Sequence, residues 1–285
     1  MTRLRIIIIT FLSLSAFAAN SLITRYALEQ TAIDEASFIM LRVVSGALFL
    51  WLFLAIKKDK NIVQGGTWSA AFALFIYAVS FTYGYGLIAA GTGALLLFGS
   101  VQITMTIAGY REGERLKVIQ LVGFILALAG LVILMLPGIS APSFIGASLM
   151  CISGVAWSIY TLQGRGASNP AASTAGNFIK AAPMATLLWL IVYLSTKNTI
   201  DLANTGVIYA LTSGIVTSGI GYIIWYSVLP ELKATQAAIV QLTVPLLVTL
   251  AGALLLNEAI TLRIVLASMA ILIGTMLVLS FKPRH

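Results

Sequence analysis

Charged side chains are scarce in this sequence. Asp, Glu, Lys and Arg make up 9% of its 285 residues, whereas 60% of the residues are hydrophobic. A soluble globular protein carries about 25% charged and about 45–50% apolar residues. A folded chain with so few charged residues cannot cover its surface with groups that water solvates. The composition therefore excludes the soluble globular classes. The high apolar content also excludes a disordered protein.

Cysteine and histidine occur once each, as Cys151 within an apolar run and as His285. A single cysteine provides neither a disulfide framework nor a cysteine metal site. The interior lacks histidine, the commonest general base and metal ligand. There is also no His-x-x-x-His pair, no pair of Asp residues within an apolar run and no glycine-framed nucleophile with a base. We therefore expect no metal, no cofactor and no enzyme activity.

Long apolar runs are abundant. A helix of about 20 apolar residues crosses a bilayer, and these runs are rich in Leu, Ile, Ala and Gly, which suits helices packed in lipid through small residues. The ten-residue alternation of a membrane β-barrel is absent. We predict an all-α integral membrane protein of ten transmembrane helices with short connections. The predicted spans are 4–24, 36–56, 68–89, 92–110, 116–136, 143–163, 171–195, 205–228, 234–256 and 262–281.

The first span begins like a signal peptide. Arg3 and Arg5 precede the apolar stretch Ile6–Phe17, and Ala16-Phe17-Ala18 resembles a cleavage site. We favour a retained transmembrane helix that starts in the cytoplasm, because this run has a counterpart in the second half of the chain that cleavage would leave unpaired.

Basic residues indicate the orientation. The net charge of +8 is spread over short loops, so it does not indicate nucleic-acid binding. With the N-terminus inside, twelve Lys and Arg residues fall on the cytoplasmic side and three outside, as expected for a multi-pass protein of the cell inner membrane with both termini cytoplasmic. The cytoplasmic set is Arg3, Arg5, Lys57, Lys58, Lys60, Arg111, Arg115, Lys117, Arg165, Lys233, Lys282 and Arg284, and the outer set is Arg25, Lys197 and Arg263.

The two halves of the chain, residues 1–140 and 141–285, resemble each other. Because each half holds five spans, an odd number, the second half enters the membrane from the opposite face. Inverted repeats are typical of secondary transporters, which bind substrate near the midplane between the repeats. Three pairs of residues in the first half correspond to three pairs in the second. Arg42/Trp51 corresponds to Lys180/Trp189, Phe17/Arg25 to Trp157/Arg165, and Glu114/Gly130 to Glu258/Gly274.

Several features of the sequence occur together. They are Arg42 early in span two, Glu114 and Glu258 just after spans four and nine, glycines in spans five and ten, and Pro245 within span nine. With them the whole chain resembles the EamA type of the drug/metabolite transporter superfamily. Span four departs from the family pattern, with Val101-Gln102 at the place of the proline. The run Leu97–Met105 is most similar to the YddG-type branch of exporters of aromatic and other amino acids. The resemblance implies a ten-helix basket around a central cavity, with spans five and ten at the periphery.

All nine acidic residues fall in loops between the predicted spans. Proton antiport through a buried carboxylate, and recognition of an organic cation by one, are therefore disfavoured. Arg42 and Lys180 are the cations inside spans. For Arg42 we favour a structural role, in which it snorkels to the outer headgroups or clamps backbone carbonyls. Lys180 has three open roles: pairing with a carbonyl freed by nearby Pro183, meeting a substrate carboxylate, or gaining and losing a proton.

Polar and aromatic residues recur at i, i+4 and i+7 on several spans, which places them on one helical face. Gln241 lies four residues before Pro245, so we expect its backbone carbonyl to be free beside its own amide. Packing or a place at the membrane interface is the alternative role for the aromatic residues. The predicted lining of a central substrate-binding cavity is Asn20, Tyr77, Ser80, Phe81, Phe98, Gln102, Trp157, Tyr160, Lys180, Tyr222, Trp225 and Gln241.

We expect a secondary transporter that exports small metabolites, above all amino acids including aromatic ones, by alternating access. The alternative is a facilitative or exchange carrier for another small organic solute or drug, and a channel or an intramembrane enzyme is less favoured. The expected partners are a small-molecule substrate and the lipid bilayer, with no nucleic acid. We favour a monomer over a homodimer formed through the small-residue stripes Gly123-x3-Ala127 and Ala270-x3-Gly274.

The predicted topology puts Gly138, between spans five and six, outside the cell. A cysteine introduced at Gly138 in a Cys151→Ser background should therefore react with a membrane-impermeant maleimide added to intact cells. Labelling from the cytoplasmic side alone, measured in inside-out vesicles, would contradict this topology.

Overall fold

The computed structural model describes residues 3–57, 65–113, 117–135, 142–165, 167, 169–196, 205–232 and 234–280. Within these ranges all regular structure is helical, which confirms the predicted class. Seven helical segments are long and apolar enough to cross a membrane, and three further apolar helices are shorter. Gly138 and Glu114, which the sequence singled out, lie outside the described residues.

The helices follow the predicted spans. Their bounds are α1 (Arg3–Gln30), α2 (Glu35–Ile56), α3 (Trp68–Leu87), α4 (Ala90–Arg111), α5 (Val118–Met135), α6 (Phe144–Gly164), α7 (Pro170–Thr196), α8 (Thr205–Thr212), the π-helix η1 (Ser213–Ile220), α9 (Gly221–Val228), the 3₁₀ turn η2 (Leu229–Glu231), α10 (Ala234–Val240), α11 (Thr243–Leu255) and α12 (Leu262–Ser280). Helix starts use local caps: the Asp34 side chain accepts from the Ser37 N–H before α2, and the Thr67 side chain accepts from the Ala70 N–H before α3.

Three departures from the predicted spans affect the site. Helix α1 continues to Gln30 rather than ending at residue 24, which brings Arg25 and Glu29 into the helix. The eighth span is continuous but has a π-helical middle, η1. The ninth span breaks at Gln241 and Leu242, so that Pro245 lies in the first turn of α11, where its missing N–H costs no helical hydrogen bond.

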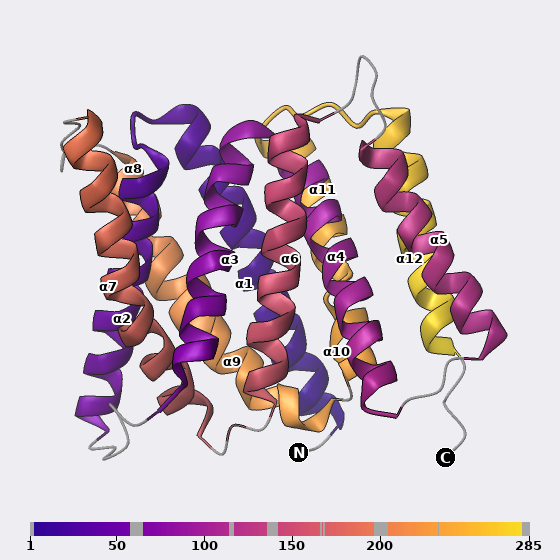
Figure 1. The fold of residues 1–285 in the computed structure, drawn as a ribbon, viewed down its shortest axis with the longest axis horizontal. Helices are drawn as coiled ribbons and strands as arrows, with labels where there is room; N and C mark the ends of the chain where they lie inside the picture. Colours follow the sequence, from indigo (N-terminus) through magenta and orange to yellow (C-terminus); the bar gives the residue numbers. More distant parts are fainter. Residues whose placement is uncertain are drawn as a thin grey trace.

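The helices pack in pairs (Figure 1). Helix α2 packs against α7, α3 against α6, and α4 against both α6 and α11, while α1 crosses close to α9. Helices α5 and α12 form a pair at one side of the molecule, as the resemblance implied for spans five and ten. Helix α1 begins and α12 ends at the same edge of the bundle.

The distribution of polarity is the reverse of that in a soluble protein. Asn20, Arg42 and Gln241 are buried, whereas Val118 and Leu254 are each 81% exposed. Large exposed apolar surfaces require an apolar environment or a partner. Together with the hydropathy of the helices, this pattern makes the chain a multi-pass membrane protein.

The two small-residue stripes pack against each other within the chain. A methyl group on Gly274 of α12 would lie 2.5 Å from the carbonyl oxygen of Gly123 and 2.6 Å from the backbone nitrogen of Ala127 on α5. Small residues at such a contact let two helix backbones approach closely in lipid. The stripes therefore join α5 to α12.

Enlarging Gly274 should separate this pair. We expect Gly274→Val to cost about 1–3 kcal/mol through overpacking and to lower the midpoint of thermal unfolding of the purified protein in detergent. The neighbouring Ile273→Val, at a side chain that is 45% exposed, is the matched control and should change it little. A fall in oligomer size on gel filtration without loss of stability would instead indicate a dimer face.

Candidate functional site

Buried aromatic rings from both halves of the chain converge around Trp157 of α6. Its ring centroid lies 4.9 Å from that of Tyr222 (α9), 5.0 Å from Tyr77 (α3) and 5.2 Å from Phe17 (α1). Aromatic pairs attract one another at these separations. We call Phe17, Tyr77, Trp157, Tyr160, Tyr222 and Trp225 the aromatic cluster.

Trp157 is held by Gln241. The indole Nε1–H donates to Oε1 of Gln241 at 2.6 Å, and the Gln241 amide donates to the carbonyl of Ala237 at 2.9 Å. The prediction that the Gln241 backbone carbonyl is free is wrong, because this oxygen accepts from the Val244 N–H at 3.0 Å. The chain turns tightly here between α10 and α11, and Val244 rather than Pro245, which has no N–H, donates to this carbonyl.

Arg42 is buried, and its partners differ from the two that the sequence favoured. Its side chain is buried, neither snorkelling nor clamping carbonyls. Nε donates to Ser218 Oγ at 3.1 Å, and Nη2 donates to the hydroxyls of Tyr222 at 3.0 Å and Tyr77 at 3.3 Å. The guanidinium carbon also lies 5.0 Å from the ring centroid of Phe81, a cation–π distance.

Two features favour this inward position of Arg42. Helix α2 lies so close to η1 that a side chain at Gly214 would clash with the Arg42 backbone, and the π-helix presents the Ser218 hydroxyl at the contact. The spacing of Ser218 and Tyr222, four residues apart on one face, was a sequence signal for this acceptor pair. Sequence reasoning did not connect it to Arg42.

Asn20 ties α1 to the π-helix. Its Oδ1 accepts from Ser213 Oγ at 2.6 Å and from Thr217 Oγ1 at 2.9 Å, and its Nδ2 lies 3.4 Å from the Tyr77 hydroxyl. π-Helical turns occur often at functional sites. Here the turn supplies polar groups to two residues of the site, Asn20 and Arg42.

A small cavity lies beside this group. Its volume is about 10 Å³, which is room for roughly one water molecule. The structure is therefore closed around the predicted site, and a larger ligand requires the helices to part. The lining residues are Phe17, Ser21, Tyr77, Phe81, Leu97, Phe98 and Trp157.

The remaining predicted residues differ in position. Gln102 is buried on α4, where its amide donates to Thr106 Oγ1 at 3.1 Å. Ser80 is buried but donates to the Ile76 carbonyl of its own helix at 2.6 Å.

Lys180 does not join this group. Its Nζ donates to the carbonyl oxygen of Gly65 at 2.7 Å. The expected carbonyl partner is thus found, but on the segment before α3 rather than on its own helix. Asn177, one turn earlier, accepts from the Thr67 N–H of the same segment at 3.0 Å, so this face of α7 holds the chain just before α3.

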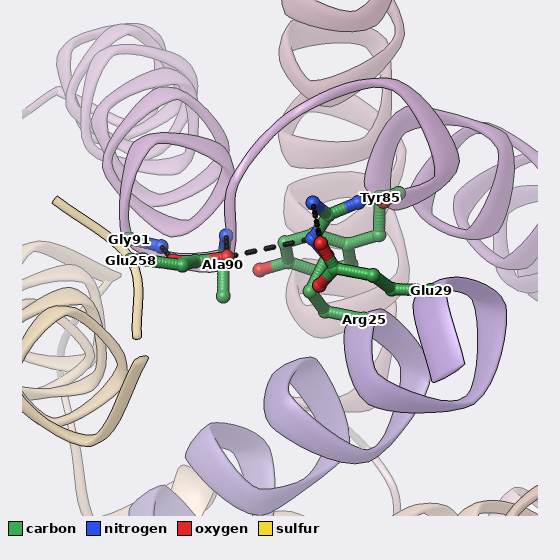
Figure 2. A network of polar contacts seen from close by, with 6 residues as sticks. All are labelled: Arg25, Glu29, Tyr85, Ala90, Gly91 and Glu258. Atoms are coloured by element: carbon green, nitrogen blue, oxygen red, sulfur yellow. Dashed lines mark hydrogen bonds and ion pairs between the residues drawn. The ribbon is translucent and has the colours of Figure 1, made fainter. Parts of the chain in front are cut away.

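A second polar network joins the two halves at one end of the helices (Figure 2). Glu258 accepts from the backbone N–H groups of Ala90 at 2.7 Å and Gly91 at 3.3 Å, at the positive end of α4. Arg25 contacts Glu258 at 3.4 Å through Nε and donates to the Tyr85 carbonyl at 3.0 Å. Arg25 also pairs with Glu29 at 3.1 Å. This network fastens α1, the α3–α4 connection and the segment after α11 together.

A simpler pair lies at the opposite end. Arg165, just after α6, contacts Glu112, just after α4, at 3.2 Å. The two side chains are 26% and 52% exposed, so water screens their attraction. The Arg25 and Glu258 side chains are only 16% and 13% exposed. The ion pair of Arg25 and Glu258 is therefore better shielded from water than the pair of Arg165 and Glu112 at the other end.

Comparisons with known proteins agree with this architecture. The model of the EamA-like transporter family matches the chain at residues 4–136 and again at 144–280. An uncharacterized protein of Pseudomonas aeruginosa is 49% identical over 98% of this chain and 96% of its own. An uncharacterized transporter of Archaeoglobus fulgidus is 28% identical over 73% of this chain and 74% of its own.

More distant similarity extends to a Bacillus subtilis protein and to a solved structure. The uncharacterized transporter YoaV is 22% identical over 82% of this chain and 83% of its own. A crystal structure shares the fold with a TM-score of 0.70 over 98% of both chains at 16% identity. The chain belongs to the EamA-like transporter family and is a multi-pass membrane transporter of small solutes.

Proposed function

We propose that this transporter exports small metabolites, above all amino acids with apolar or aromatic side chains, across the cell inner membrane by alternating access. The observation that carries the proposal is the aromatic cluster, because it is buried and takes its rings from both halves of the chain. Such rings suit an apolar substrate side chain, and the amide and hydroxyl groups around them suit its polar end.

Two inverted five-helix halves, residues 1–140 and 141–285, would provide the alternating access. The packing supports them, because contacts that such a repeat makes equivalent occur in pairs: α3 on α6 corresponds to α1 on α9, and α2 on η1 corresponds to α7 on α3. The double family match also supports them. Ten transmembrane helices result when α8, η1 and α9 count as one and α10 and α11 as another.

The charge pairs at the two ends support a closed-outside conformation. Each pair joins an arginine of one half to a glutamate of the other: Arg25 with Glu258, and Arg165 with Glu112. With cytoplasmic termini, as the basic residues predict, the better buried network of Arg25 lies outside. Opening to the outside would then require Glu258 to leave the start of α4.

The positions of the acidic residues favour facilitated or exchange transport. In the described helices and their caps, the carboxylates lie at helix ends, as with Glu29, Glu35, Glu112 and Glu231. None of these is at mid-span, where coupled carriers often place a titrating carboxylate. An exchange carrier for another small organic solute or drug is therefore the second candidate.

Uptake of a labelled amino-acid panel into proteoliposomes, with and without a pH gradient, tests the proposal. We expect uptake of aromatic amino acids, stimulation by unlabelled substrate on the other side of the membrane, and at most a modest effect of the gradient. A steep requirement for the gradient would contradict the coupling, and absence of trans-stimulation would favour a channel.

Weakening the outer network should open the central cavity to the outside. We expect Glu258→Gln to raise the rate at which an outside maleimide labels a cysteine at Ser21 of the cavity lining, in a Cys151→Ser background. Charge-assisted hydrogen bonds contribute about 1.5–3 kcal/mol, so the increase should be about tenfold or more.

Glu29→Gln is the matched control, because Glu29 pairs with the same arginine but its side chain is 36% exposed. It should change the labelling rate little. Equal effects of the two substitutions, or no effect of Glu258→Gln, would show that Glu258 does not hold this end closed.

Removing the indole of Trp157 should alter selectivity. We expect Trp157→Ala to reduce transport of phenylalanine and tryptophan more than that of alanine, because it removes the ring that contacts Phe17, Tyr77 and Tyr222. Trp189→Ala is the control, since Trp189 stacks on Tyr193 within α7, outside the cluster. Equal loss for all three substrates would assign Trp157 to packing alone.

Gln241→Ala tests the group that holds Trp157. It removes the acceptor of the indole N–H, and the loss of one hydrogen bond costs about 0.5–1.5 kcal/mol. We expect substrate binding, measured by titration calorimetry, to weaken several-fold to tenfold while the protein still reaches the membrane. Unchanged affinity would mean that Gln241 does not contribute to the site.

A further inference from the structure

We propose that Arg42 is the binding group for a carboxylate on the transported solute. The inference rests on the proposed function and deepens it, because it names the charged group that a substrate must carry. It also reassigns Arg42 from the structural role that its sequence position favours.

Arg42 has no counter-ion among the described residues. A guanidinium does not lose its proton in a protein, and a buried charge is normally paired with an opposite charge. The hydrogen-bond acceptors of Arg42 are the neutral hydroxyls of Ser218, Tyr77 and Tyr222. The ion pairs among the described residues involve Arg25 and Arg165, not Arg42. Nη1 of Arg42 is buried with no hydrogen-bond partner in the described part of the chain.

Arg42 also lies beside the small cavity. The guanidinium carbon lies 5.3 Å from the ring centroid of Tyr77 and 5.0 Å from that of Phe81. Both rings line the small central cavity. The positive charge is therefore next to the cavity, behind two of its wall residues. When the helices part for a substrate, a shift of the Tyr77 ring would bring the guanidinium into contact with it.

A substrate carboxylate would bind Arg42 more strongly than the neutral hydroxyls do. A carboxylate accepts charge-assisted and often bidentate hydrogen bonds from arginine, which are about twice as strong as neutral ones. It would replace the phenol oxygens of Tyr77 and Tyr222 at Nη2 and also engage Nη1. The phenols thus hold the guanidinium in place while the cavity is empty, and the aromatic cluster receives the side chain of the solute.

Lys180 provides the internal contrast. It occupies the position equivalent to Arg42 in the second half, but its ammonium donates to a backbone carbonyl at Gly65. It is partly exposed and lies away from the aromatic cluster. The structure thus gives one of the two equivalent cations a backbone partner and leaves the other with neutral side-chain hydroxyls beside a cavity.

The test compares three probes that share a phenyl ring: L-phenylalanine, 3-phenylpropionate and phenethylamine. Binding is measured by titration calorimetry on the purified full-length transporter in detergent. We expect the wild-type protein to bind the two carboxylates about 10- to 100-fold more tightly than the amine, as a charge-assisted hydrogen bond allows. Arg42→Gln should remove this preference, and Arg42→Lys should retain part of it.

Lys180→Gln is the matched control, because it removes the equivalent cation of the other half. It should leave the ratio of carboxylate to amine affinity unchanged. If Arg42→Gln does not fold, the ratio for the wild-type protein still decides: equal affinity for phenylalanine and phenethylamine, or no binding of either carboxylate, overturns the assignment. Loss of the preference in Lys180→Gln instead of Arg42→Gln overturns it as well.

The outcomes separate the two proposals. Binding of 3-phenylpropionate without binding or uptake of any amino acid supports the role of Arg42 but contradicts amino-acid export. Uptake of phenylalanine with no preference for carboxylates supports the proposed function but contradicts the role of Arg42.

Discussion

The buried charge of Arg42 is the constraint on which the centre of this structure depends. The helices expose apolar side chains, so water and other outside groups cannot satisfy polar side chains in the middle of the bundle. The three hydroxyls around Arg42 therefore come from α3, η1 and α9, which must stay together as long as the guanidinium is not bound elsewhere. Asn20 extends the same network to α1 through the Tyr77 hydroxyl, and it also accepts hydrogen bonds from Ser213 and Thr217 of η1.

The proposed role of Arg42 would connect packing to transport. The same tyrosines that accept from Arg42 contribute rings to the aromatic cluster, so a ligand that binds Arg42 also disturbs the contacts of Trp157 with Tyr77 and Tyr222. A ligand shifts a conformational equilibrium only by its differential affinity for the two states. If Arg42 exchanges the tyrosine hydroxyls for a substrate carboxylate, as proposed, the substrate has different affinities for the two states.

In the proposed alternating access, the ends of the helices would form the second element that changes between the two states. Glu258 binds the start of α4 and also Arg25 of α1, so one contact closes the gap between the two halves. The pair of Arg165 and Glu112 at the other end is more exposed and contributes less. The α5–α12 pair is tightly joined through Gly274 and lies at one side of the molecule.

The sequence alone determined the helical segments. Their apolar runs are bounded by polar connections, and a bilayer allows a run of that length little choice but to be a helix. Hydropathy could not detect the break at Gln241 or the π-helix at Ser213–Ile220, because neither changes the apolar character of its span. It also ended the first helix too early, since the last turns of α1 are held by burial of Ala27 against Phe38 and Ala210.

For the site, helical spacing identified most of the aromatic residues that converge, because the side chains at i, i+4 and i+7 share a face whatever the tertiary structure. Only the tertiary structure decided between the two equivalent cations. Arg42 and Lys180 correspond in the sequence, as the single cations within the second predicted span of each half, with Lys180 deeper in its span. The direction of each side chain depends on which acceptors the neighbouring helices present: hydroxyls of η1, α9 and α3 for Arg42, and a backbone carbonyl at Gly65 for Lys180.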